Sequence, residues 1–224
     1  MSPRRARAVR VSPATRSIRR VFAESAATLL AVFAREIDSL ERMSRLLVST
    51  LARGRTVFFC GNGGSAAEAQ HLATELVVRF VRNRGALPAM ALGADGSMLT
   101  AAGNDLGFDR VFARQIEALG RPGDLLVAMT TSGRSPNMIQ AVRAARARGV
   151  QVIGMTGEAG KAFARRCDAA LVVPSLKTAR IQEMHLLVGH ILCERAEEIA
   201  GRRRPKQARR RPKQARRRPK RGRR

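Results

Sequence analysis

The chain has 224 residues and a formal net charge of +26, from 43 Lys and Arg residues against 17 Asp and Glu residues. The excess lies at the ends: residues 201–224 hold 15 basic and no acidic residues, and residues 1–20 hold 7 basic and no acidic residues. Residues 21–200 therefore have the composition of an ordinary globular domain. No apolar run approaches the roughly 18–20 residues that a membrane-spanning helix requires, so no membrane association is expected.

The cysteines and the N-terminus bear on the cellular compartment. Cys60, Cys167 and Cys193 are odd in number, widely spaced and without a CxxC pair, which argues against a disulfide framework or a cysteine zinc site. We expect the three cysteines to be free thiols that pack as small buried hydrophobic residues, in a protein of the reducing cytoplasm. The basic N-terminus lacks the apolar segment of a secretory signal, although its Arg-rich, acid-poor start is also typical of organelle transit peptides, the less favoured alternative.

Hydrophobic periodicity predicts helices first and then alternating strands and helices. Apolar residues at helical spacing over residues 15–52 predict one or two amphipathic helices. Later apolar runs predict five strands, at residues 56–60, 88–92, 124–129, 151–155 and 169–173. The intervening segments predict helices at about 66–80, 108–119, 136–148 and 178–200. This alternation indicates one α/β domain with a parallel five-stranded sheet, Rossmann-like or flavodoxin-like, covered by helices on both faces.

The basic C-terminal segment is a repeat. Residues 202–208, RRRPKQA, recur identically at 209–215 and partly at 216–220. The segment has prolines and no large apolar side chain, so it cannot bury a core, and a coiled coil is excluded because the heptad lacks apolar positions. The predicted organisation is a disordered N-terminus at 1–14, a domain at 15–200 and a disordered tail at 201–224.

Two loops follow predicted strands and open predicted helices. The first, at residues 61–65, contains three glycines that allow the backbone to approach a ligand at a helix N-terminus, where anions bind. Its glycines fit neither the dinucleotide-binding nor the P-loop pattern. The second, at 130–135, carries four hydroxyl residues, which suit a phosphate monoester. Either loop alone could be a simple turn with a Ser cap, but together at the carboxyl edge of a parallel sheet they favour ligand binding.

Four motifs in order resemble those of one family. They are GNGGSAAEAQH at 61–71, GND at 103–105, TSGRSPN at 131–137 and RIQEMH at 180–185. Over about residues 15–200 the chain resembles the sugar isomerase (SIS) domain, and more narrowly the phosphoheptose isomerases. The resemblance implies a single SIS domain, a homotetramer, and conversion of sedoheptulose 7-phosphate into D-glycero-D-manno-heptose 7-phosphate for the lipopolysaccharide core.

Aldose–ketose isomerisation through an enediol needs a base and an acid. His71 precedes Glu75 by four residues on a predicted helix, so both side chains share one face at a separation that suits a shared metal ion. Such a pair is also common as a simple surface interaction. Gln182, His185 and His190 lie on the predicted terminal helix.

The resemblance assigns roles to these residues. It implies that His71, Glu75, Gln182 and His190 bind zinc and that Glu75 and His190 form the acid–base pair. It also implies a substrate-binding set: Asn62, Gly63, Gly64, Ser65, Glu75, Asn104, Asp105, Thr130, Thr131, Ser132, Ser135 and Gln182. His185 fits neither role and is interpreted as a structural or surface histidine. The chain departs from familiar members at Glu68, where Asp is frequent.

The spacing of two implied zinc ligands raises a geometric problem. Gln182 and His190 are eight residues apart, which on a straight helix is about 12 Å along the axis. A single ion with bonds of about 2.0–2.2 Å cannot reach both. Either the helix begins after Gln182 with a bend, or ligands come from different subunits, and the long apolar stripe of residues 15–52 favours the second option.

Two other functions remain open from the sequence. The first is a non-catalytic SIS protein that forms tetramers and recruits the replication initiator, but members of that group typically lack the equivalents of Glu75 and His190. The second is a nucleic-acid-associated protein, because the dense Arg and Lys tract at 201–224 can bind phosphates without reading sequence.

Overall fold

The computed structural model describes residues 12–200. The predictions for residues 1–11 and for the basic repeat at 201–224 lie outside the described residues. In the part of the chain that the structure describes, no helix is both long enough and apolar enough to cross a bilayer. The three cysteines are free, with Cys60 and Cys193 buried and Cys167 only partly buried.

The sheet has five parallel strands, as predicted. They are β1 (Val57–Gly61), β2 (Ala89–Ala91), β3 (Leu125–Thr130), β4 (Gln151–Gly157) and β5 (Ala169–Val173). Their order across the sheet is β2-β1-β3-β4-β5, and every neighbouring pair is parallel. The strands β1, β3 and β4 are almost wholly buried, which explains why they read as continuous apolar runs.

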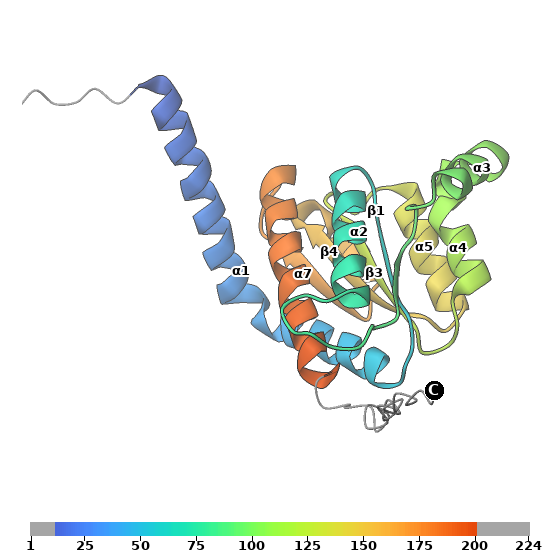
Figure 1. The fold of residues 1–224 in the computed structure, drawn as a ribbon. Coiled ribbons are helices and arrows are strands. Elements are labelled where there is room, and N and C mark those ends of the chain that lie inside the picture. The colour runs from blue at the N-terminus through green and yellow to red at the C-terminus, as the bar shows by residue number, and fades with distance from the viewer. Residues whose placement is uncertain (1–11, 201–224) are drawn as a thin grey trace, which may run out of the picture.

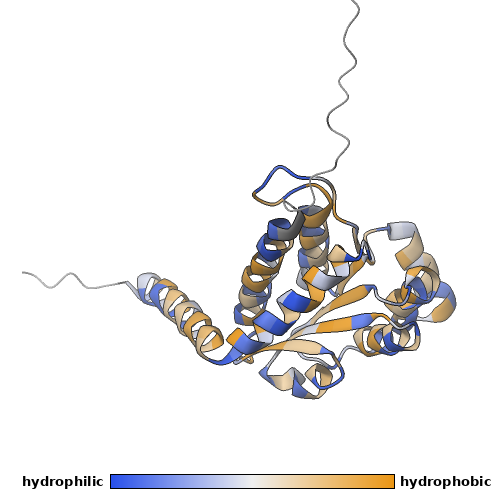
Figure 2. Ribbon diagram, turned by 90° about the horizontal axis from the view of Figure 1, so that it is seen from below, coloured by the Kyte–Doolittle hydropathy of each residue, from blue (hydrophilic) through white to orange (hydrophobic). Residues whose placement is uncertain are grey.

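Helices cover both faces of the sheet (Figure 1). One hydrophobic cluster joins α1 (Pro13–Ala52), α2 (Gly64–Val77) and α7 (Thr178–Ala200) to one face. A second cluster joins α4 (Val111–Leu119), α5 (Pro136–Ala147) and the short α6 (Lys161–Ala164) to the other. Figure 2 shows the central strands as the most hydrophobic layer, between helices of mixed polarity.

Two helices were not predicted, the four-residue α6 and the longer α3 (Gly96–Leu106). The helix α3 and the 3-10 turn at Phe108–Arg110 occupy the segment between β2 and α4, so α4 begins at Val111 and not at residue 108. No residue of α3 is fully buried, and a helix without a buried face shows no clear apolar periodicity in its sequence. Its local signal was the cap at Asp95, whose side chain accepts a hydrogen bond from the Met98 N–H.

The segment predicted as one or two helices is the single 40-residue helix α1. Ser12 caps its start by accepting a hydrogen bond from the Thr15 N–H at 3.1 Å, and Pro13 occupies the first turn. Its buried residues lie between Val32 and Leu51. The first half, residues 13–32, extends past the sheet (Figure 1). Its exposed apolar residues are Ile18, Val21, Phe22, Leu29 and Leu30, and Phe33 directly continues this run.

Candidate active site

The two predicted ligand loops meet at the carboxyl edge of the sheet. They follow β1 and β3, which are neighbours, and the helices after them pack on opposite faces. This is the switch point at which open α/β sheets form ligand crevices. Gly63 adopts φ +56°, which favours glycine, and a Cβ on Gly64 would lie 2.6 Å from the Gln182 Nε2 atom, so Gly64 leaves room for the Gln182 side chain in its present position.

A cavity of about 220 Å³ lies between these loops and the start of α7. It unites eight of the predicted substrate-binding residues. They are Asn62, Gly64, Ser65, Thr130, Thr131, Ser132, Ser135 and Gln182. Met129 and Thr178 also line it and were not predicted. The cavity therefore combines hydroxyl groups with a helix N-terminus, the donor set that suits a phosphate group.

The hydroxyl groups of the second loop keep their donor capacity. Thr130 Oγ1 accepts from the Gly133 N–H at 3.2 Å, and Ser132 Oγ accepts from the Arg134 N–H at 3.3 Å, so both use lone pairs only. Ser135 is the N-cap residue of α5, but its side chain makes no capping hydrogen bond. The simple-turn interpretation, in which a serine caps the helix, is therefore wrong for this loop.

Asn137 is a residue of this region that the sequence reasoning did not single out. Its amide and that of Asn62 exchange two hydrogen bonds, at 2.9 and 2.8 Å, and its residue surface is only 2% exposed. Because Asn62 lies on the first loop and Asn137 follows the second, this pair fixes the two loops relative to each other. Its signal in the sequence was the last position of the TSGRSPN motif.

Glu68 lies one turn after Ser65 on α2. Burial raises the pKa of its carboxyl to about 7, although a side-chain hydrogen bond with Ser65 lowers it. Its second carboxylate oxygen is buried without a hydrogen-bond partner. Ser65 Oγ in turn accepts from Gln182 Nε2 at 3.4 Å. A carboxyl group that titrates near neutral pH thus lies directly behind the cavity.

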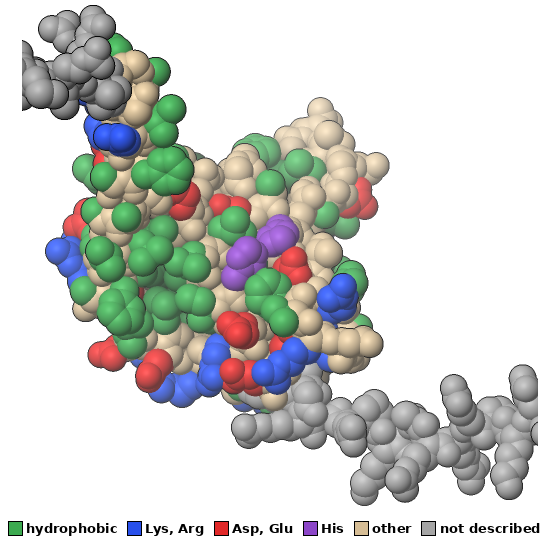
Figure 3. All heavy atoms as spheres, turned by 60° about the vertical axis from the view of Figure 1, so that its left-hand side comes forward, with side chains coloured by type: hydrophobic (Ala, Val, Ile, Leu, Met, Phe, Trp, Pro, Cys, Tyr) green, Lys and Arg blue, Asp and Glu red, His purple; other side chains and the backbone are tan. Residues whose placement is uncertain are grey.

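The predicted acid–base residues gather farther along the same two helices. The Nε2 atoms of His71 and His190 are hydrogen-bonded at 2.8 Å, and His71 Nε2 lies 3.6 Å from Glu75 Oε1. The sequence argument allowed Glu75 and His190 to come from different chains, but the structure places both around His71 of one chain. In Figure 3 the two histidines form a surface patch beside a broad area of hydrophobic side chains.

Gln182 does not join this group. The helix α7 runs from Thr178, before Gln182, as predicted, so the less favoured alternative of a helix that begins after Gln182 with a bend is wrong. Gln182 lies in the cavity, eight residues before His190. Over residues 12–200, no three His, Cys, Asp or Glu side chains form a group that could hold a metal ion. Within one chain, Gln182 thus lies apart from His71, Glu75 and His190, and the set of four zinc ligands stays a prediction.

Comparisons with known proteins identify the family. Residues 21–157 match the SIS domain. The phosphoheptose isomerase of Nitratidesulfovibrio vulgaris is 52% identical over 162 residues, which are 72% of this chain and 78% of that protein. The one from Rhodospirillum rubrum is 48% identical over 80% of this chain and 95% of its own length. The solved phosphoheptose isomerase GmhA of Neisseria gonorrhoeae superposes with a TM-score of 0.77 at 41% identity, over 82% of this chain and 98% of that one.

The chain belongs to the phosphoheptose isomerases of the SIS family. It is therefore a sugar-phosphate isomerase, and the prediction of an enzyme is confirmed. The resemblance seen in the four motifs and the predicted single SIS domain are confirmed with it.

Four of the predicted substrate-binding residues lie apart from the cavity of this isomerase, and one of them, Glu75, belongs to the histidine group. Asn104 and Asp105 are exposed on α3, where Asn104 Nδ2 donates to Asp105 Oδ1 at 2.7 Å. Gly63 is exposed at the tip of the first loop and does not line the cavity. Within one chain, Asn104 and Asp105 thus join neither the hydroxyl loops nor the histidine pair, and their substrate-binding role stays a prediction.

His185 is structural. It is fully buried, neither ring nitrogen has a hydrogen-bond partner among the described residues, and burial lowers the pKa of its imidazole to about 4. This agrees with the interpretation that excluded it from the active site. Sequence reasoning missed Phe80, which stacks on His190, and it missed Arg84 and Glu197, which bind each other and the end of α2; no motif marks these residues.

Proposed function

We propose that the chain converts sedoheptulose 7-phosphate into D-glycero-D-manno-heptose 7-phosphate by enediol acid–base chemistry. One observation supports this most: the chain carries both the hydroxyl-lined cavity and the Glu75–His71–His190 group. The cavity alone would suit a sugar-phosphate-binding protein without activity, including the initiator-recruiting alternative. The carboxylate and the imidazole supply the proton-transfer groups that such a protein does not need.

The proposed reaction assigns separate tasks to the two groups of residues. The loop hydroxyls and backbone N–H groups at residues 62–65 and 130–135 bind the 7-phosphate. Of Glu75 and His190, one removes a proton from C1 of the ketose and the other donates a proton to the C2 carbonyl oxygen, which gives the enediol. A proton delivered to C2, with loss of the O1 proton, then completes the aldose.

Zinc is proposed for the assembled enzyme and not for the single chain. Two imidazole nitrogens and a carboxylate are donor types that zinc prefers, but Gln182 lies two helical turns away in the cavity. A second copy of the chain could place its own Gln182, together with the cavity that this residue lines, beside the histidine pair of the first copy. When bound there, zinc would polarise the sugar carbonyl. No step assigned above to Glu75 or His190 depends on it.

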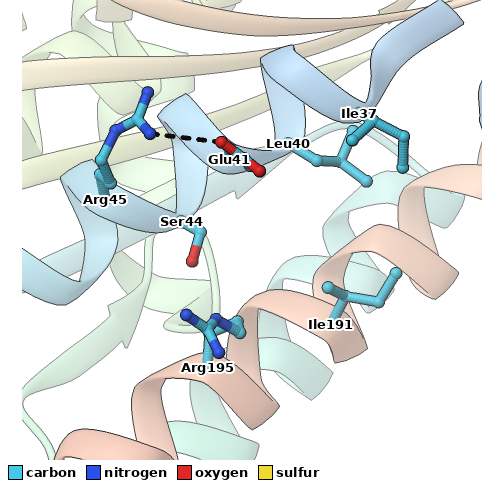
Figure 4. A pocket seen from close by; sticks show the side chains of 7 residues that line it. All are labelled: Ile37, Leu40, Glu41, Ser44, Arg45, Ile191 and Arg195. Carbon is cyan, nitrogen blue, oxygen red and sulfur yellow. Dashed lines mark hydrogen bonds and ion pairs between the residues drawn. The ribbon is translucent and has the colours of Figure 1, made fainter.

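We propose a homotetramer in which other copies cover the apolar face of α1. This face consists of the exposed residues of its first half and continues into a groove of about 500 Å³ between α1 and α7. Ile37, Leu40 and Ile191 give the groove its apolar floor, and Arg45 and Arg195 lie at its edge (Figure 4). An apolar area of this extent is typical of a protein interface. Light scattering on the full chain tests the tetramer, and Leu30→Glu should dissociate it.

The test of the activity is direct. The purified full chain is incubated with sedoheptulose 7-phosphate, and formation of the aldose is followed by NMR; fructose 6-phosphate serves as the shorter control ketose. We expect conversion of the heptose and little of the hexose. Absence of conversion by a correctly assembled protein, with and without added Zn²⁺, would contradict the proposed substrate.

Mixed assemblies test whether two chains build one site. His190→Gln removes the proton-transfer half, and Ser132→Asp places a negative charge in the phosphate half. If the cavity of one chain serves the histidines of another, mixed tetramers of these two inactive variants contain some complete sites and recover part of the activity. No recovery in demonstrably mixed tetramers would place both halves of each working site on one chain.

A further inference from the structure

The segment that follows α2 is fastened by one buried carboxylate. Glu197 on α7 accepts hydrogen bonds from the backbone N–H groups of Phe80, Val81 and Arg82 at 2.8, 2.9 and 2.8 Å. It also accepts from Arg84 Nε at 3.1 Å. Burial alone would raise the pKa of Glu197, but these donors outweigh it and hold the pKa below its ordinary value. The Glu197 carboxylate is therefore charged, and its four hydrogen bonds hold this segment in place.

Arg84 extends the fastening to α2. Its Nη1 donates to the Leu76 carbonyl at 2.8 Å, and its Nη2 donates to the Glu75 carbonyl at 2.6 Å. These carbonyls belong to the last turn of α2, which has no following turn to satisfy them. The guanidinium thus caps the turn that carries Glu75. The side chains of Arg84 and Glu197 are only 3% and 1% exposed.

The fastened segment places an aromatic ring on His190. The rings of Phe80 and His190 are stacked, with centroids 5.2 Å apart and planes at 22°. The ring of His71 meets His190 edge-on, at 5.1 Å and 73°. His190 is therefore held on one face by Phe80 while its Nε2 atom points at His71. The hydrogen bond from the Phe80 backbone N–H to Glu197 fixes the backbone that carries this ring, and the ring also packs against the core.

We propose that the buried Arg84–Glu197 pair positions both members of the acid–base pair: Arg84 fixes the α2 turn that carries Glu75, and Glu197 fixes Phe80 against the ring of His190. All three residues are positioning residues and contact no reacting atom. The catalytic part of this inference rests on the proposed function. Stability alone explains the pair poorly, because a buried ion pair adds little net stability relative to apolar residues of the same volume.

The first experiment uses Phe80→Leu in the full chain, with Phe80→Tyr as the variant that keeps the ring. The chain has three histidines, so their Cε1–H NMR signals can be assigned with single His→Gln variants. We expect Phe80→Leu to move the His190 signal and leave that of buried His185 unchanged. It should lower kcat about tenfold, with KM changed less than twofold, because His190 is misplaced while phosphate binding is intact. Phe80→Tyr should restore both.

The second experiment tests the ion pair with Arg84→Lys. Lysine keeps the charge but lacks the fork that reaches Glu197 and two carbonyls together. We expect the same displacement of the His190 signal and the same selective loss of kcat. Val81→Ala is the matched control, since it keeps the backbone hydrogen bond to Glu197 and removes no ring. It should change neither the signal nor kcat.

The outcomes separate this inference from the proposed activity. A His190 signal that does not move in Phe80→Leu or Arg84→Lys overturns the inference, and so does a moved signal with unchanged kcat. A change in KM as large as that in kcat also overturns it, because a general loss of structure would affect both. If the wild type does not turn over sedoheptulose 7-phosphate, the proposed substrate is wrong, and the NMR measurement still decides whether Phe80 and Arg84 orient His190.

Discussion

The helices α2 and α7 carry two groups of candidate site residues, one at their start and one farther along, and these groups differ in how fully a single chain encloses them. At the start of the pair, the cavity is enclosed by two loops whose residues are paired within the chain, as Asn62 is with Asn137 and Ser65 with Gln182. Farther along, the side chain of His71 is 43% exposed and the histidine pair borders an uncovered apolar area (Figure 3). One chain therefore encloses the cavity, whereas the end that carries Glu75 and the two histidines is uncovered, and we expect an assembly to exclude water from it.

The largest effect is expected at the proton-transfer end. Glu75→Gln and His190→Gln should each lower kcat at least about 100-fold, because each removes a positioned proton-transfer group. Steady-state kinetics with the heptose phosphate measures the loss.

Neither substitution should unfold the protein, since both side chains lie at the surface end of the pair and make no core contact of the kind seen for His185. Thermal unfolding and light scattering provide the control. Wild-type turnover by either variant would show that the acid–base assignment is wrong.

A smaller effect of a different kind is expected in the cavity. Ser132→Ala should raise KM about tenfold and leave kcat nearly unchanged, because its hydrogen bond to the phosphate exists in both the ground state and the transition state. Ser132→Thr keeps a hydroxyl and should stay close to the wild type. A loss confined to kcat would mean that Ser132 belongs functionally to the other end of the helix pair.

The parts of the fold that could be predicted from the sequence are those with a clear apolar pattern. The central strands and α7 have strong apolar patterns because the core buries them, and β5 and α7 begin and end at the predicted residues. The helix α3 escaped prediction because packing, and not its own pattern, holds it beside α4. The choice between one helix and two in this segment is decided by the absence of a helix-breaking residue between Pro13 and Ala52, so α1 is continuous.

The candidate site was predictable where its parts are local. The glycine loop and the hydroxyl loop are contiguous motifs, and their meeting follows from the parallel sheet. The fastening of Phe80 by Glu197 joins residues 117 apart in sequence, and neither residue type is distinctive at its position. The same holds for Asn62 and Asn137, 75 residues apart. The first contact depends on the packing of α2 against α7, and the second on the pairing of β1 with β3, neither of which periodicity predicts in residue detail.

The buried carboxyl behind the cavity predicts a pH dependence of stability. Burial raises the pKa of Glu68 from its ordinary value of 4.5 to about 7, so between these values the folded chain holds a proton that the unfolded chain releases. Stability from this group is present below pH 4.5 and is lost as the pH rises through 7. Glutamine cannot ionise, so the Tm of the Glu68→Gln variant should fall less between pH 5 and pH 8 than the Tm of the wild type.

Glu158→Gln provides the control for that measurement, because the Glu158 carboxylate is partly exposed in the 3-10 turn after β4 and pairs with Lys161. Its Tm profile should follow that of the wild type. Equal pH profiles for Glu68→Gln and the wild type would mean that the Glu68 carboxyl is solvated in the assembled protein.

The smallest effect on turnover is expected from the C-terminal repeat. Truncation after Gly201 removes all 15 basic residues of 201–224 and none of the residues of either end of the site, so kcat and KM should stay within about twofold of the wild type. Retention on heparin or DNA should fall sharply, because a dense Arg and Lys tract binds polyanions through counterion release, which also makes retention fall with salt. A scrambled tail of equal composition should restore it, since the binding reads no sequence. Equal retention by the truncated and full chains would show that the repeat makes no such contact.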